Sequence, residues 1–230
     1  MDLANRERHG LPELPRKRAD RTAARKTIGG GDMTNALLMM TNRGISGNGL
    51  GNRLADMRYF EHKTGPMNTL ASWQRLTKKQ FPERVTEIAS QFPLVADDKN
   101  EDQQHVSVFV HGYNNSWADA VNRYEHIRTD LYDKQQLGQL VLFNWPSDAS
   151  PAGYLPDRED ARGSAGAFAQ ELVDLYDRLV TIQRAAARLK DPARVCRAKV
   201  SIIAHSMGNY VVQKALAVAA RRLNSPELSR

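Results

Sequence analysis

The sequence predicts an α/β protein in which helices cover both faces of a mostly parallel sheet, a three-layer α/β/α sandwich. Two observations predict it. Short runs of β-branched and aromatic residues alternate with longer segments of helical periodicity from residue 105 onward. Polar, turn-forming residues follow three of these runs, at 111–116, 144–147 and 204–209. Alternation of this kind is typical of right-handed βαβ crossovers, which bring the carboxyl ends of the strands to one edge. We therefore expect the functional residues at that edge.

Composition limits the class of protein. The chain has 230 residues and a net charge of +7, and residues 1–30 hold eight Lys and Arg against four Asp and Glu. We expect residues 1–33 to be a basic, disordered leader and residues 34–230 to form the folded domain. No apolar run approaches the roughly 20 residues that span a bilayer, and no secretory segment is visible. The single cysteine, Cys196, suits a reducing compartment, so we expect a cytoplasmic protein.

The first half of the domain gives weaker patterns than the second. A helical turn is expected at Glu83, directly after Pro82. A phosphate-binding loop is disfavoured for the glycine-rich segment because no Gly-Lys-Ser/Thr follows it, so we expect a flexible loop there. The expected order is a strand at 35–43, the glycine-rich loop at 44–52, a weak strand at 55–64, an amphipathic stretch at 68–92 and a surface loop at 93–104.

The second half alternates strands and helices clearly. Strands are expected at 106–110, at 140–144 ahead of Pro146, and from Val200. Ser116 and Asp119 have the spacing of a capping box at the start of the first intervening helix. The second is expected to begin near Glu159. The residues expected to face the core are Trp117, Val121, Tyr124, Ile127 and Leu131 in the first helix, Ala165, Phe168, Ala169, Leu172, Tyr176 and Leu179 in the second, and Val212, Ala215, Leu216 and Ala219 in the last.

The segment around Ser206 organises the chain. A β-branched run ends at Ala204, and helical periodicity begins directly after Gly208. A serine at such a sharp turn projects its hydroxyl above the sheet edge, beside the free N–H groups of a helix N-terminus. Ala204 and Gly208 provide the small side chains that a close approach of strand and helix needs. A serine in an ordinary strand-to-helix turn remains the alternative from this motif alone.

Four motifs in this order and at these spacings resemble the α/β-hydrolase superfamily, and within it a bacterial family of esterase- and lipase-like α/β hydrolases of unknown function. The resemblance covers residues 34–224. Its motifs are Thr41-Asn42-Arg43, Phe109-Val110-His111-Gly112-Tyr113-Asn114, Asn144-Trp145-Pro146-Ser147 and Ala204-His205-Ser206-Met207-Gly208-Asn209.

The resemblance implies roles for these residues. Ser206 would be the nucleophile, and the backbone N–H groups of Tyr113 and Met207 would form the oxyanion hole. The supporting residues would be His111, Gly112, His205 and Gly208, with the two histidines orienting loops rather than catalysing. The substrate would be a small-molecule ester or acyl compound. We expect no cofactor and no metal, since the sequence has no H-E-x-x-H motif and only one cysteine.

The catalytic acid and histidine of this superfamily follow the serine in the chain. Only 24 residues follow Ser206, and none of them is a histidine. We therefore expect an α/β-hydrolase fold that lacks its C-terminal strands. The histidines elsewhere are His9, His62, His105 and His126, and none has a position that predicts a bond to Ser206. Asp148 is the one acid expected near the correct edge, with a surface position favoured.

Three functions remain open from the sequence. The first is a serine hydrolase represented by an incomplete chain, and the second is a non-catalytic truncated module that binds a partner. In either case an exposed sheet edge predicts self-association. Binding of nucleic acid or an anionic surface rests on the leader alone and is disfavoured, because no nucleic-acid-binding motif is present. Tyr113, Trp145 and Tyr154 suggest an aromatic cleft, although a core position is equally consistent with the pattern.

Overall fold

The structure, a computed structural model, describes residues 36–93, 103–147, 154–188 and 198–223. The expected leader at 1–33, Asp148 and Cys196 lie outside these residues. Within the described part of the chain, no helix is long and apolar enough to cross a membrane.

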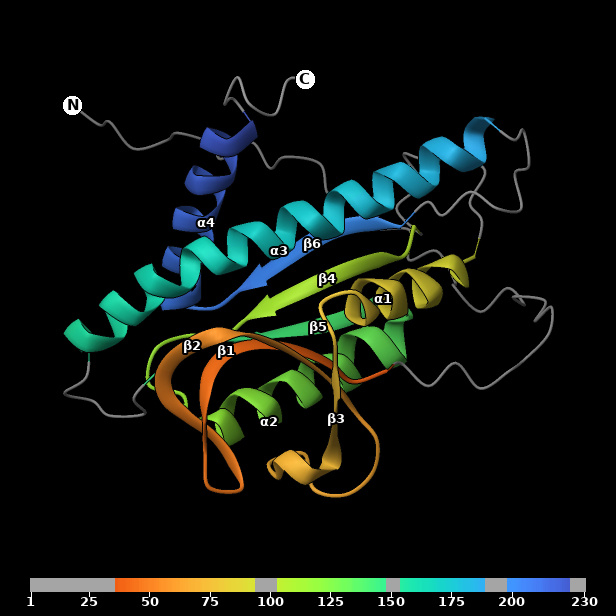
Figure 1. Cartoon of the computed structure of the whole chain (residues 1–230). Coiled ribbons are helices and arrows are strands. Elements are labelled where there is room, and N and C mark those ends of the chain that lie inside the picture. Colours follow the sequence, from red (N-terminus) through yellow and green to blue (C-terminus); the bar gives the residue numbers. More distant parts are fainter. Residues whose placement is uncertain (1–35, 94–102, 148–153, 189–197, 224–230) are drawn as a thin grey trace, which may run out of the picture. The chain divides into compact units, whose positions relative to one another are not determined.

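One six-stranded sheet forms the middle of the domain (Figure 1). Its spatial order is β3-β2-β1-β5-β4-β6. The strands are β1 (Leu38–Ser46), β2 (Gly49–His62), β3 (Trp73–Leu76), β4 (His105–Val110), β5 (Gly138–Asn144) and β6 (Lys199–Ala204). Strands β1, β5, β4 and β6 run parallel, whereas β2 is antiparallel to both β1 and β3. The prediction of a mostly parallel sheet is therefore confirmed.

Helices cover both faces of this sheet. They are α1 (Gln80–Ser90), α2 (Trp117–Ile127), α3 (Tyr154–Arg188) and α4 (Met207–Leu223). Val108 and Phe143 face a core shared with α1, α3 and α4. Their strand neighbours Phe109 and Leu142 face a second core with α2. Successive residues of a strand point to opposite faces, so these alternating apolar residues bury both sides and produce the predicted three layers.

Strand register places the carboxyl ends of three strands level with one another. Val110 of β4 pairs with Phe143 of β5 on one side and with Ala204 of β6 on the other. The residue after each of these begins a polar segment, namely His111, Asn144 and His205. These three segments therefore meet at one edge of the sheet, as the sequence predicts.

The expected loop at 44–52 is instead a β-hairpin. β1 continues to Ser46, which pairs with Gly49 of β2, and the turn contains Gly47 at a φ of 55°. Glycine is required at Gly49 for another reason, since a Cβ there would lie 2.7 Å from the Trp117 ring. The glycines thus serve a tight turn and a close helix–sheet contact, and the prediction of a flexible loop was wrong.

The stretch at 68–92 contains a strand that the sequence did not predict. Trp73–Leu76 pairs with Tyr59–His62 as β3, after a short 3-10 turn at Leu70–Ser72. The following helix begins at Gln80, three residues before the predicted Glu83. Pro82 lies in its first turn, where backbone N–H groups have no helical partner and a proline loses nothing.

Three residues expected in the core are exposed. A π-helix at Arg128–Asp133 follows α2 and changes the helical phase, so Tyr132 is buried and Leu131 is 42% exposed. In α3, which begins at Tyr154 rather than near Glu159, Leu175 faces the core and Tyr176 is 57% exposed. Leu216 of α4 is 52% exposed beside a fully buried Ala215.

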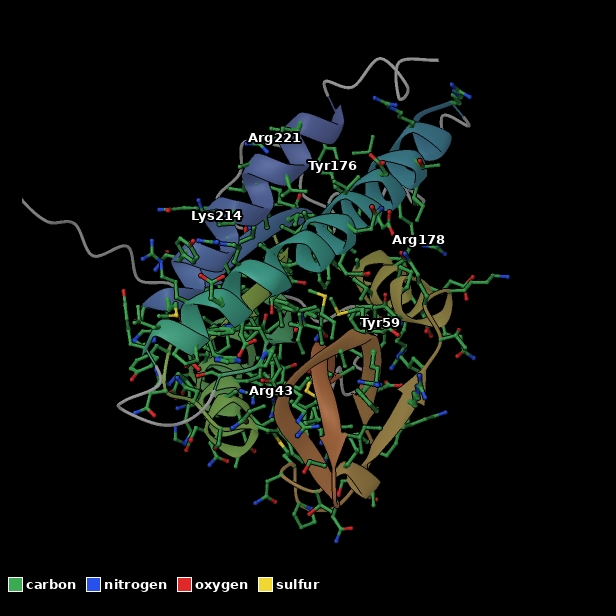
Figure 2. The ribbon with its side chains drawn as sticks, turned by 60° about the vertical axis from the view of Figure 1, so that its left-hand side comes forward. Arg43, Tyr59, Tyr176, Arg178, Lys214 and Arg221 are labelled. Atoms are coloured by element: carbon green, nitrogen blue, oxygen red, sulfur yellow. The ribbon has the colours of Figure 1, made fainter. Side chains whose placement is uncertain are left out.

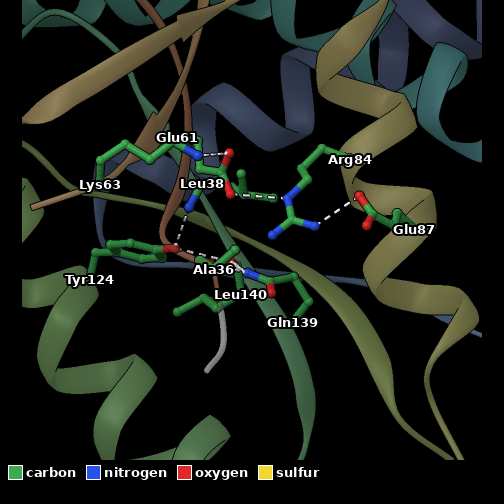
Figure 3. Close-up of polar contacts among 9 residues, drawn as sticks. All are labelled: Ala36, Leu38, Glu61, Lys63, Arg84, Glu87, Tyr124, Gln139 and Leu140. Carbon is green, nitrogen blue, oxygen red and sulfur yellow. Dashed lines mark hydrogen bonds and ion pairs between the residues drawn. The ribbon is translucent and has the colours of Figure 1, made fainter. Parts of the chain in front are cut away.

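Local polar contacts anchor α2 at both ends. The capping box predicted for Ser116 and Asp119 is present, with each side chain accepting from the other residue's backbone N–H. Farther along α2, the buried Tyr124 hydroxyl accepts from the Leu38 N–H at 3.1 Å and donates to the Leu140 carbonyl at 3.0 Å (Figure 3). That hydroxyl joins the starts of β1 and β5 to the helix that covers them.

Candidate active site

Ser206 occupies a strained turn at the end of β6. The strand ends at Ala204 and α4 begins at Met207, so His205 and Ser206 are the whole connection. Ser206 has a φ of 52°, a left-handed conformation that non-glycine residues rarely adopt. The first turn of α4 closes on it, because the Asn209 N–H donates to the Ser206 carbonyl at 3.0 Å. The Ser206 side chain is exposed to solvent. Strain of this kind is concentrated at functional sites.

Gly208 lets α4 begin directly against β4. A Cβ on Gly208 would lie 2.5 Å from the Val110 carbonyl oxygen and 2.7 Å from that of His111. The contact is held from the other side as well, since the His205 N–H donates to the Val110 carbonyl at 3.0 Å. Any side chain at Gly208 would therefore push the serine turn away from the end of β4.

Gly112 brings a second segment against the serine. A Cβ on Gly112 would lie 2.9 Å from the Ser206 Cβ and 2.6 Å from the His205 Nδ1. The segment then turns at Asn114, whose φ is 56°. The structure thus places the Gly112 backbone beside the serine, with Tyr113 as the next residue of the chain.

His111 is fully buried under this segment. Its Nδ1 lies 2.9 Å from the Gly112 carbonyl oxygen, and its Nε2 lies 3.0 Å from the Asn144 Oδ1. The ring stacks on Trp145, with centroids 5.2 Å apart. Burial, and next the nearby Arg43 charge, lower the pKa of His111 to about 3. A neutral imidazole has a single N–H and therefore donates to only one of these two oxygens, and neither ring nitrogen bonds the Ser206 hydroxyl. Trp145 is fully buried too, which places it in the core and outside any aromatic cleft.

The fully buried Arg43, labelled in Figure 2, joins its own motif to the motif at 144–147 and to Asn115, the residue that follows the motif ending at Asn114. It reaches from β1 to the Asn144 Oδ1 at 2.8 Å, the Asn115 carbonyl at 2.7 Å and the Ser147 carbonyl at 3.3 Å. Asn115 in turn donates from its side chain to the carbonyls of Gly112 and Tyr113, at 3.0 and 2.7 Å. One guanidinium therefore fixes the loop that contacts Ser206. A guanidinium is planar and carries five N–H donors, so one Arg43 side chain can bond oxygens from several segments at once.

Asp157 belongs to the same network, and the sequence did not single it out. It is fully buried in the first turn of α3. Its carboxylate accepts from the Ser147 hydroxyl at 2.5 Å and from the Asn114 N–H at 3.4 Å. Because α3 was expected to begin near Glu159, Asp157 fell outside the predicted helix. The available signal was an acidic residue directly after Pro156, the arrangement of a first helical turn.

A family model matches residues 87–226 of the chain and is described as an alpha/beta hydrolase of unknown function (DUF900). The chain belongs to this α/β-hydrolase family. The resemblance seen in the four motifs is thereby confirmed at the level of the superfamily. Searches of curated proteins and of solved structures each found no match.

Among the described residues of this α/β hydrolase, each histidine has other partners or lies elsewhere in the fold. The His205 Nδ1 accepts from Arg123 at 3.1 Å. His105 lies at the opposite end of β4 and contacts the Ser201 hydroxyl. His62 faces the Gly65 carbonyl, and His126 lies in the last turn of α2. In the part of the chain that the structure describes, no histidine or carboxylate bonds to the Ser206 hydroxyl.

The described ranges contain no group of three His, Cys, Asp or Glu side chains that could hold a metal ion.

Proposed function

We propose that this α/β hydrolase cleaves carboxylic esters or related acyl compounds, with Ser206 as its nucleophile. The observation that carries the proposal is the geometry of Ser206, an exposed hydroxyl at positive φ on a two-residue link between β6 and α4. A hydroxyl presented in this way can reach a bound carbonyl carbon without obstruction from its own backbone. A small-molecule acyl substrate follows from this assignment.

The oxyanion hole in this proposal consists of the backbone N–H groups of Met207 and Tyr113. Met207 is the first residue of α4, and among the described residues its N–H has no acceptor. The Gly208 and Asn209 N–H groups, by contrast, bond to the His205 and Ser206 carbonyls. Two donors at fixed positions would stabilise the charge that develops on the carbonyl oxygen. Loss of one such donor typically lowers the rate by about 100- to 1,000-fold.

The reaction would follow the usual order of acyl transfer. Ser206 attacks the carbonyl carbon as a base accepts its proton, the alcohol leaves, and water releases the acyl group from the serine. The described residues supply no base, so the proposal assigns it to a group outside them. Asp157 is committed to the loop network through Ser147, and we propose a positioning role for it.

Hydrolysis of p-nitrophenyl acetate tests this function. We expect Ser206→Ala to lower kcat/KM by at least about 1,000-fold, because the nucleophile is lost. The matched control is Ser90→Ala, which removes another serine hydroxyl, one that bonds the Glu87 carbonyl near the end of α1. Equal rates for the two variants would overturn the assignment of Ser206.

A non-catalytic role in partner binding is the second candidate. It is favoured by the absence of a base at Ser206 in the described residues and by β6, which is the outermost strand of the described sheet. Self-association through this edge stays a prediction. Its signature would be a folded protein that hydrolyses no ester and sediments as a dimer or larger species.

A further inference from the structure

Aromatic and cationic side chains link the starts of α3 and α4 beside Ser206. The Tyr113 ring contacts the edge of the Tyr154 ring, with centroids 5.6 Å apart. Tyr154 is the first residue of α3, and Arg158 follows it by one helical turn. Arg158 in turn lies over the Tyr210 ring, with its Cζ 5.4 Å from the centroid. Tyr210 lies one helical turn after Ser206, so this series of contacts ends close to the serine.

Three cationic side chains converge on Tyr210 in this region. The Lys214 Nζ lies 5.3 Å from the same ring centroid as Arg158, and Figure 2 shows Lys214 projecting from α4. The Arg162 guanidinium beside the Tyr210 hydroxyl is the main reason that the pKa of Tyr210 lies below its ordinary value. Side chains on a helix tilt toward its N-terminus, so the Tyr210 ring leans back toward the serine turn.

The positive charge of this cluster is only partly balanced. Glu159 pairs with Arg162 at 3.4 Å, and both side chains are more than half exposed, so the pair is weak. Among the described residues, neither Arg158 nor Lys214 has a carboxylate within ion-pair distance. Like charges gathered at one ring repel one another, and a bound anion would relieve that repulsion.

We propose that Arg158, Arg162 and Lys214, with the Tyr210 hydroxyl, bind an anionic group of the acyl substrate, a carboxylate or a phosphate. Guanidinium groups match the geometry of both oxyanions, and the ammonium group adds a further donor. The cluster begins about 6 Å along α4 from the serine, since four residues of helix rise by that distance. The substrate is thus an ester with a second, acidic group several bonds from the scissile carbonyl. This inference rests on the proposed function of Ser206.

Anion binding is tested first without catalysis, in the full-length Ser206→Ala protein. Inorganic phosphate and succinate are titrated separately by calorimetry, and the tighter ligand identifies the preferred oxyanion. We expect Arg158→Gln/Lys214→Gln to weaken binding by at least about tenfold. The control, Arg188→Gln/Arg221→Gln, removes the same charge from exposed ends of the same two helices and should bind as the parent does. Equal weakening in both double variants, or no binding by the parent, would overturn the proposal.

Substrate preference is tested in the protein with Ser206 intact. The ratio of kcat/KM for p-nitrophenyl hemisuccinate to that for neutral p-nitrophenyl butyrate should fall about tenfold in Arg158→Gln/Lys214→Gln and stay constant in the control. If both esters were hydrolysed and the ratio were unchanged, the anion site would be refuted, whereas the proposed hydrolase function would stand. Specific anion binding without hydrolysis of either ester would support the site and refute the proposed function.

Discussion

Gly208→Ala tests whether the serine turn depends on direct contact between α4 and β4. The new Cβ would lie 2.5 Å from the Val110 carbonyl oxygen and 2.7 Å from that of His111, whereas ordinary contacts begin at 3.4 Å. Both obstacles are backbone atoms inside a packed structure, so neither can rotate away. The first turn of α4 must therefore move by several tenths of an ångström. Overpacking of this size costs about 1–3 kcal/mol of the free energy of unfolding.

The same displacement would carry Ser206 away from Gly112 and Tyr113. A misplacement of about 1 Å between reacting groups can cost about 100-fold in rate. We therefore expect Gly208→Ala to lower both the urea midpoint of unfolding and the rate of p-nitrophenyl acetate hydrolysis. Stability is measured by far-ultraviolet circular dichroism in urea, and hydrolysis is measured below the unfolding transition so that the two effects separate.

Gly166→Ala is the matched control for this substitution. Gly166 lies within α3, and a Cβ there would meet nothing within 4 Å. Alanine in an open helical position should raise stability by about 0.5–1 kcal/mol and leave hydrolysis unchanged. The reasoning would be refuted if Gly208→Ala were as stable as Gly166→Ala, because the close approach would then carry no cost.

Three further predictions concern buried polar groups. Because the pKa of His111 is about 3 when folded and about 6.5 when unfolded, stability should fall by up to about 1.4 kcal/mol per pH unit from pH 6.5 downward. In His111→Gln this pH dependence of the free energy of unfolding, measured by urea titration, should be absent. The same dependence on pH in the variant and the wild type would contradict the assignment. Arg43→Met leaves several buried oxygens without a donor, so we expect a loss of about 2–4 kcal/mol in the same assay, and a loss below about 1 kcal/mol would contradict this. Burial would raise the pKa of Glu61, but bonds from Lys63 and Arg84 lower it overall (Figure 3). The ionised Glu61 carboxylate therefore contributes about 1 kcal/mol to the free energy of unfolding at neutral pH. This contribution is lost as the pH falls through the pKa of Glu61 in the folded protein. Glu61→Gln should show no such loss, and a difference between the two proteins that does not change with pH would contradict the assignment.

The sequence predicted the elements whose local and tertiary preferences agree. The β-branched run before Ser206, the capping box at Ser116 and the buried strand before Pro146 each satisfy a local pattern and a place in the sheet. These elements set the topology and bring the three polar segments to one edge. Local pattern and position in the sheet also agree at the serine turn, so the sequence alone was enough to predict it.

The remaining features depend on contacts that a local pattern does not contain. The glycines at 44–52 serve a hairpin and the Trp117 ring, which lies far away in sequence. Leu131 and Tyr132 exchange places because a π-helix shifts the phase, and periodicity alone assumes a constant one. Asp157 was missed because its role comes from Ser147 and a loop in another part of the fold.

Intact-mass analysis after treatment with a fluorophosphonate tests the central claim most directly, because this probe reacts with an activated serine whatever the natural substrate. The account predicts one adduct on the folded wild-type protein and none on Ser206→Ala or on heat-denatured wild type. No adduct on the folded protein, or an adduct that persists in Ser206→Ala, would contradict the claim that Ser206 is the nucleophile.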